Sequence, residues 1–335
     1  MGVNDGSEAG GAHAAGAGTA ATPDPAAEIV GLAAKLLRLQ SRLGAHPPGA
    51  GQGADPLAVP GLPAQHGSAR HAAVRSGIEV LRGFAVSLVG EIQESIERDA
   101  FHYLYQPIAS VASGAVEGYA ALLRWQRGQE SVPPPLFLPI AEQAGMLPRI
   151  QQRLLGEVAT VLARLGPAVT IGIDWSVAQL ADADAITAMI EWAAQGDNDA
   201  ARVIIEINDR AGMPDPGSLR ASLVRLRKAG FRLALDGFCG GHGGFAYLGR
   251  LPIDLIKIDA SLIGALEHSA RAALIVEGII DLAHRLGHRV VAQGVGTAQQ
   301  LARLAALGCD LAQGDTIGGA TRDPVASATR RAGAA

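Results

Sequence analysis

Acidic and basic residues stand at or near the ends of four short apolar segments of the chain. Asp174 follows one of these segments, Glu206 lies inside the next, Asp236 ends a third, and Lys257 lies in a fourth. Carboxylate oxygens are the ligands that Mg²⁺ and Ca²⁺ prefer. A buried carboxylate or lysine is costly unless it is paired or bound to a metal. The four positions together therefore predict one shared concave site.

The segments that carry these residues alternate with helical stretches. Short apolar runs cover residues 104–108, 169–173, 203–207, 232–235, 255–258 and 290–292, and helical stretches include 150–165, 219–229, 270–286 and 298–307. Apolar strands that lead into amphipathic helices predict an α/β fold with a parallel sheet. The length fits a (β/α)8 TIM-like barrel, in which active sites form at the carboxyl ends of the strands. A doubly wound open sheet fits the periodicity as well, although no GxGxxG motif opens a first helix.

The first hundred residues have a different character. Residues 1–23 lack an apolar period and are predicted to be disordered, as is the tail 326–335. Helices are predicted over 24–44 and 70–99, joined by a flexible linker over 45–69 that is rich in Pro, Gly and Ala. Both helices carry heptad spacing, which favours a helical hairpin or a dimerising coiled coil. The alternative is that each helix packs on the surface of the main domain.

Composition excludes several classes of protein. The chain has 335 residues and a net charge of −4, so it lacks the basic character of a protein that binds long nucleic acid. No apolar run is long enough to span a membrane, and the N-terminus does not resemble a signal peptide. Cys239 and Cys309 are far apart in sequence and neither belongs to a CxxC motif, so we expect both to be reduced thiols. The sequence therefore predicts a cytoplasmic protein.

Six ordered motifs resemble the EAL domain family of cyclic-di-GMP phosphodiesterases, from about residue 101 to residue 315. They are Tyr105-Gln106-Pro107-Ile108, the octapeptide from Gly118 to Trp125, Phe137 to Glu142, Asp174 to Leu180, Tyr247 to Asp259, and Leu307 to Gly314. The resemblance implies an EAL-type barrel with one irregular strand over residues 100–325. It also implies a bacterial protein of cyclic-di-GMP signal transduction.

The departures from the family pattern fall at the positions of its chemistry. Family enzymes hold two divalent cations that activate a water for attack on a phosphodiester. Ala120 stands at the metal-binding Glu of the signature, Gly237 at the second Asp of Asp-Asp-Phe-Gly, and Gln293 at a catalytic Glu, while Lys257 is retained. The resemblance therefore implies a catalytically degenerate member, with no catalytic residue expected and no cofactor required.

Two readings of the remaining carboxylates stay open. Asp174, Glu206 and Asp236 could form a residual site for one Mg²⁺ or Ca²⁺ ion. Alternatively, these three carboxylates pair with Lys257 and Arg124.

The resemblance places a ligand site at Gln106, Arg124, Lys257 and Gln313. Non-catalytic members of the family keep the nucleotide pocket as a sensor, so we expect a receptor for cyclic-di-GMP. The main alternative is an adaptor that binds a protein partner and no nucleotide, and an active metal-dependent phosphodiesterase is the least favoured reading. We expect a protein partner, and the heptad helices favour a homodimer.

Overall fold

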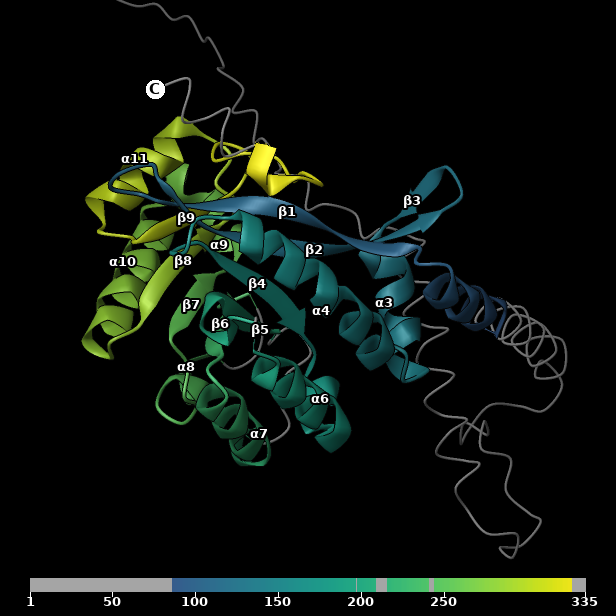
Figure 1. The fold of residues 1–335 in the computed structure, drawn as a ribbon. Helices are drawn as coiled ribbons and strands as arrows, with labels where there is room; N and C mark the ends of the chain where they lie inside the picture. The colour runs from purple at the N-terminus through teal and green to yellow at the C-terminus, as the bar shows by residue number, and fades with distance from the viewer. Residues whose placement is uncertain (1–85, 197, 209–215, 241–243, 327–335) are drawn as a thin grey trace, which may run out of the picture.

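The structure is a computed structural model, and it describes residues 86–196, 198–208, 216–240 and 244–326. Its strands form one sheet in the order β1-β9-β8-β7-β6-β5-β4-β2-β3, and a further pairing of β1 with β2 closes eight of them into a barrel. Helices surround this barrel, as Figure 1 shows. The predicted TIM-like barrel is confirmed, and the open-sheet alternative is wrong because β1, at one edge of the sheet, also pairs with β2 and so closes the ring.

The elements have the following bounds. The strands are β1 (Phe101–Ser110), β2 (Val116–Arg127), β3 (Glu130–Val132), β4 (Thr170–Trp175), β5 (Val203–Asn208), β6 (Arg232–Phe238), β7 (Leu255–Ile258), β8 (Arg289–Gln293) and β9 (Leu311–Gln313). The α-helices are α3 (Pro134–Gln143), α4 (Leu147–Arg164), α5 (Val177–Ala181), α6 (Ala183–Ala194), α7 (Pro216–Lys228), α8 (Gly244–Leu248), α9 (Ala260–Gly264), α10 (Ala270–Arg285) and α11 (Ala298–Ala306). Two short 3₁₀ helices are η1 (Ala200–Arg202) and η2 (Ala265–Glu267).

One strand of the barrel runs against the others. β1 is antiparallel to both of its neighbours, with Gln106 opposite Ala120 on β2 and Ile108 opposite Gln313 on β9. The pairings that run from β2 through β4 to β9 are parallel. β1 is therefore the irregular strand of this barrel, and it closes the ring.

Apolar side chains fill the middle of the barrel interior and divide it into two ends. They are Ile108, Ala120, Ile204, Ala234, Leu255, Val291 and Leu311. Side chains alternate between the two faces of each strand, so polar residues two positions further along point into the same interior. We call the side at the carboxyl ends of the parallel strands the upper end, and the side at their first residues the lower end.

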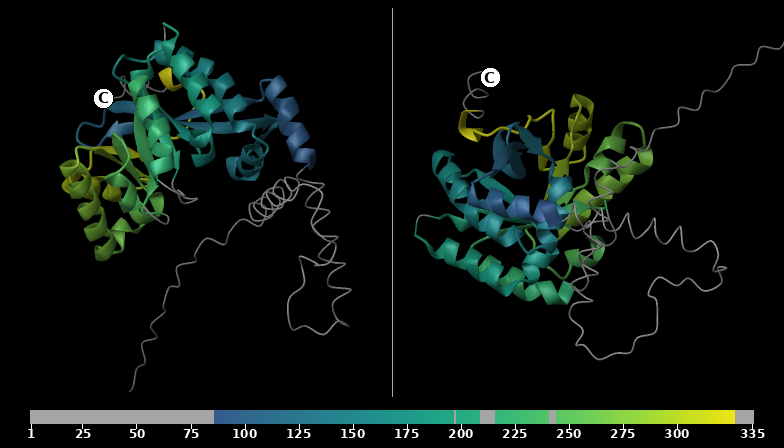
Figure 2. Two further views of the ribbon diagram at one scale, coloured as in Figure 1. Left: turned by 90° about the horizontal axis from the view of Figure 1, so that it is seen from below. Right: turned by 90° about the vertical axis from the view of Figure 1, so that its right-hand side faces the viewer.

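The helix that precedes the barrel packs on it. In the described part of this helix, residues 86–97, the side chains of Leu88, Ile92 and Ile96 are buried in the main hydrophobic core. An ion pair of 2.9 Å between Glu91 and Arg127 ties the same helix to β2, beside α3 (Figures 1 and 2). Leu88 and Ile92 of this helix therefore pack in the same core as the barrel residues, and the predicted coiled coil stays a prediction.

The predictions for 1–23, 24–44 and 45–69, for the predicted helix up to residue 85, and for the tail from residue 327 lie outside the described residues. None of the helices that the structure describes is long and apolar enough to cross a membrane.

Candidate functional site

Three of the predicted site residues meet in the interior near the upper end of the barrel. Glu206 on β5, Asp236 on β6 and Lys257 on β7 are all buried. Asp174, at the end of β4, lies opposite Glu206 in the strand register but is exposed to solvent. The parallel register brings these strand ends together, as the sequence pattern predicts.

Lys257 is the centre of the buried charges. Its ammonium group donates a hydrogen bond to Glu206 Oε2 and lies 3.7 Å from Asp236 Oδ1. Burial alone would lower the pKa of Lys257, but the negative charges of Glu206, Asp236 and the nearby Asp174 outweigh burial and raise its pKa. Lys257 therefore stays protonated at neutral pH and balances part of the negative charge around it.

Two amides complete the surroundings of Asp236. Gln293 Nε2 donates to Asp236 Oδ1 at 2.7 Å, and Asn208 Nδ2 donates to Asp236 Oδ2 at 3.5 Å. Asn208 is not among the predicted site residues. The signal for it was present, because Asn208 lies two residues after Glu206 on the same strand and so shares its face.

A glycine makes room for the Glu206 carboxylate. A Cβ placed on Gly172 of β4 would lie 2.0 Å from Glu206 Oε1. Gly172 is paired on its other side with Ala120 of β2, the position of the family's signature Glu. The Glu206 side chain therefore occupies space that any larger residue at position 172 would need.

These contacts do not fit the two-cation centre that the family pattern implies. A divalent ion needs several oxygen ligands that converge on it. Here Lys257 already lies against Glu206, and Asp236 accepts hydrogen bonds from two amides. In the described part of the chain, no group of three or more His, Cys, Asp and Glu side chains is arranged to hold a metal ion. A single residual Mg²⁺ or Ca²⁺ at Asp174, Glu206 and Asp236 stays a prediction.

A larger cavity of about 350 Å³ opens beside this cluster. Its walls are mainly apolar, and its polar lining includes Arg124, Asp174 and Asn208. The Arg124 side chain is partly exposed, and its Nη1 donates to the carbonyl oxygen of Leu123 at 2.8 Å. The size and lining are typical of a site for a small organic ligand.

The other predicted ligand residues do not line this cavity. Gln313 Nε2 donates to Gln106 Oε1 at 2.9 Å across β9 and β1, and Gln106 Nε2 lies 3.5 Å from the carbonyl oxygen of Gly318. The buried Oε1 of Gln313 accepts no hydrogen bond from the described residues. The two glutamines thus contact each other across β1 and β9, next to β2, the strand that carries Arg124, and they lie outside the cavity.

Comparison with known proteins gives a consistent result. The family model described as the EAL domain matches residues 89–320. The chain is 30% identical over 239 residues to the bifunctional diguanylate cyclase/cyclic di-GMP phosphodiesterase MucR of Pseudomonas aeruginosa, an alignment that covers 70% of this chain and 35% of that protein. It is 31% identical over 229 residues to the cyclic di-GMP phosphodiesterase NbdA of the same organism, covering 67% and 29%.

A solved structure described as the PaMucR phosphodiesterase in complex with c-di-GMP superposes with a TM-score of 0.65 at 29% identity, covering 70% of this chain and 97% of that one. The chain thus spans about a third of the length of these two curated relatives, and nearly all of the solved domain.

Proposed function

The chain belongs to the EAL domain family, and from this membership we propose that it is a catalytically inactive receptor in cyclic-di-GMP signalling. The relatives named above are cyclic-di-GMP phosphodiesterases, and one related domain is known as a complex with c-di-GMP. We therefore expect the chain to bind cyclic-di-GMP, as the related domain does, but not to hydrolyse it.

The contact of Lys257 with Glu206 carries the proposal of inactivity. Two-metal catalysis stabilises the attacking and the leaving oxygen together, so it needs carboxylates that are free to bind cations. In this chain one buried carboxylate is paired with Lys257, and Ala120 offers no ligand oxygen. Gln293 cannot accept a proton, which removes base assistance from its position. Each ~1.4 kcal/mol lost at the transition state costs tenfold in rate, so several such losses together leave no useful turnover.

Arg124 and its cavity support the proposal of binding. A guanidinium group presents a planar fork of donors that suits phosphate oxygens. The apolar walls of the cavity can bury a base while Arg124 contacts a phosphate. Lys257 and two amides hold the charges of the buried carboxylates. Asp174 and Glu142, the two carboxylates that line the cavity, are therefore the groups that oppose a bound phosphate.

A calorimetric titration of the full chain with cyclic-di-GMP tests this proposal, with Ca²⁺ and with Mg²⁺ and with analysis of the nucleotide products. We expect saturable binding with no turnover in either ion. Arg124→Ala should weaken binding by at least about tenfold, the value of one charge-assisted contact. The matched control is Arg127→Ala, three residues along the same strand, where the arginine pairs with Glu91 away from the cavity.

Each other outcome rejects one part of the proposal. Binding heat that is absent at high nucleotide concentration rejects the receptor and leaves the protein-binding adaptor. Hydrolysis that depends on Mg²⁺ rejects the inactive site and restores the phosphodiesterase.

A further inference from the structure

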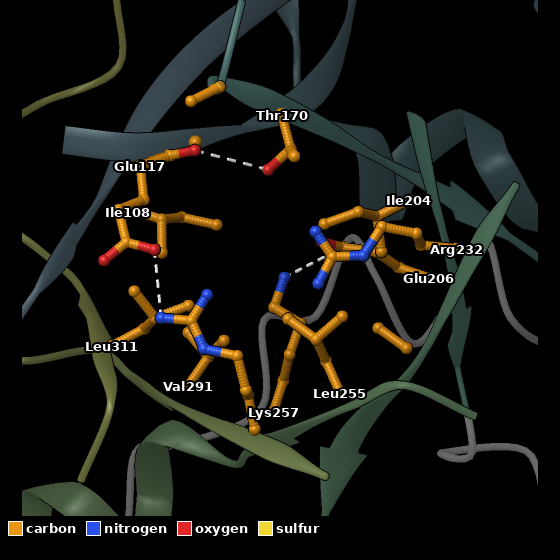
Figure 3. A pocket seen from close by; sticks show the side chains of 14 residues that line it. Ile108, Glu117, Thr170, Ile204, Glu206, Arg232, Leu255, Lys257, Val291 and Leu311 are labelled. Carbon is orange, nitrogen blue, oxygen red and sulfur yellow. Dashed lines mark hydrogen bonds and ion pairs between the residues drawn. The ribbon is translucent and has the colours of Figure 1, made fainter. Parts of the chain in front are cut away.

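A second cavity, of about 70 Å³, lies at the lower end of the barrel. Its lining includes the first interior residues of alternate parallel strands, Gly118 on β2, Thr170 on β4, Arg232 on β6 and Arg289 on β8. Its inner wall combines apolar residues from the middle of the barrel, such as Val291 and Leu311, with the Lys257–Glu206 pair (Figure 3). The cavity shares no lining residue with the one that contains Arg124, so the two are separate.

The two arginines of this cavity differ in their partners. Arg289 Nη2 makes an ion pair of 2.9 Å with Glu117 Oε2, and both side chains are about 40% exposed. Arg232 is a partly buried residue, and its guanidinium group points into the cavity (Figure 3). Among the residues that the structure describes, its side chain has no hydrogen-bond or ion-pair partner. Its N–H donors are therefore available to a ligand.

The sum of charges around the cavity is positive. Two guanidinium groups face one carboxylate, Glu117, and the Lys257–Glu206 pair that forms part of the wall cancels itself. The hydroxyl of Thr170 lies on the same wall, where it donates to the backbone carbonyl oxygen of Glu117 at 3.4 Å. The cavity thus contains one guanidinium group without a partner in the described part of the chain, that of Arg232, and a second, that of Arg289, which is paired with Glu117.

We propose that this lower cavity is a binding site for a small tetrahedral oxyanion, of the class of inorganic phosphate, held by Arg232 and Arg289. Arginine suits such an anion because its donors match the spacing of two oxygens. A cavity of this size holds a few waters or one small anion. It is too small for a nucleotide, which needs a pocket of about 300 Å³ or more. The exposed Glu117–Arg289 pair leaves the mouth open to solvent, so an anion can enter.

The experiment is a titration of the full chain with inorganic phosphate at constant ionic strength, followed by calorimetry and by phosphorus NMR. We expect one saturable site per chain. Arg232→Met should weaken phosphate binding by at least about tenfold, the loss of one charge-assisted contact. Arg220→Met is the matched control, because Arg220 is an exposed arginine on α7 and lies outside the cavity. Circular dichroism and thermal melting verify that each variant folds.

A second variant keeps the test decisive if Arg232→Met does not fold. Glu117→Gln removes the only carboxylate that competes for Arg289 within the cavity lining, apart from the Lys257-paired Glu206. It should therefore strengthen phosphate binding. Unchanged or weaker binding in Glu117→Gln overturns the proposal, as does the absence of saturable binding in the wild-type chain.

Two further measurements show which cavity binds the anion and whether it is free or part of a larger molecule. Loss of phosphate binding in Arg124→Ala, with binding retained in Arg232→Met, assigns the anion to the upper cavity and overturns the proposal. A parallel titration with a simple phosphate monoester separates a free anion from a phosphoryl group on a larger molecule. Sensitivity to Arg232→Met in either titration supports the site, and insensitivity in both rejects it.

Discussion

The ionic groups at the two ends of the barrel interior differ in burial and in pairing. Near the upper end, Lys257 is 2% exposed and contacts one carboxylate directly and a second at 3.7 Å. At the lower end, the Arg289–Glu117 pair is about 40% exposed and Arg232 has no partner among the described residues. The upper end therefore has more carboxylates than cations around the buried Lys257. The lower end has more cations than carboxylates, close to solvent.

This difference shows what decides whether an interior polar cluster serves stability or binding. A buried ion pair whose members satisfy each other resists disruption, because removal of one partner leaves an uncompensated charge. A cluster near solvent with an unmatched charge loses little when one group is removed, and it retains capacity for a ligand. The upper cluster is therefore expected to dominate stability measurements, and the lower cluster to dominate anion binding.

The largest expected effect comes from removal of the cation near the upper end. Lys257→Met leaves Glu206 and Asp236 buried with no positive partner, and it should lower the free energy of unfolding by about 3–5 kcal/mol. Urea unfolding measures this change. Lys228→Met, at an exposed lysine on α7, is the control and should stay within about 0.5 kcal/mol of the wild type. A loss below about 1 kcal/mol for Lys257→Met would remove the contrast between the two ends.

A smaller effect is expected from filling the space beside Glu206. Gly172→Ala places a methyl group where the Glu206 carboxylate now lies, so the carboxylate must move away from Lys257. We expect a destabilisation of about 1–3 kcal/mol, the usual range for an overpacked interior. Gly278→Ala on α10 has open space around it and should be neutral or slightly stabilising. Equal melting temperatures for the two variants would show that Glu206 is not held in place.

The smallest effect is expected at the lower end. Glu117→Gln breaks a half-exposed ion pair, so the free energy of unfolding should change by no more than about 1 kcal/mol. Glu130→Gln, at an exposed residue of β3, is the control for the loss of one surface charge. A destabilisation of Glu117→Gln as large as that of Lys257→Met would mean that both ends are built for stability.

Many strands of the barrel could be predicted from the sequence, because a fully buried strand is a continuous run of apolar residues. The run 255–258 coincides with β7, and the run 203–207 lies within β5. The direction of β1 was not accessible, since periodicity shows which residues are buried but not which way a strand runs. That direction follows from the short connection over residues 111–115 to β2, a strand that the apolar runs did not predict, because so short a connection allows only an antiparallel pair.

The candidate site shows the same division. The cluster of Glu206, Asp236 and Lys257 followed from polar residues at or near strand ends, and pairing with Lys257 was one of the two alternatives. The hydrogen-bond partner of Arg124 could not be predicted from the sequence. In the structure Arg124 donates to the backbone carbonyl oxygen of the neighbouring Leu123, and a backbone acceptor leaves no signal in the residue pattern. Arg232 and Arg289 were missed, because a basic residue at the start of a strand usually indicates a surface position. Their meeting depends on the packing of alternate strands around a closed ring.

The antiparallel closure of the barrel also has a consequence during biosynthesis. β1 can pair with β2 as soon as both are made, but its other edge waits for β9. Gln106 and Gln313, which meet across that last seam, are 207 residues apart in the chain. At a synthesis rate of about 5–20 residues per second, the open edge of β1 persists for roughly 10–40 s on the ribosome. An unpaired strand edge is a template for aggregation, so the nascent chain needs protection at β1 until its final strand emerges.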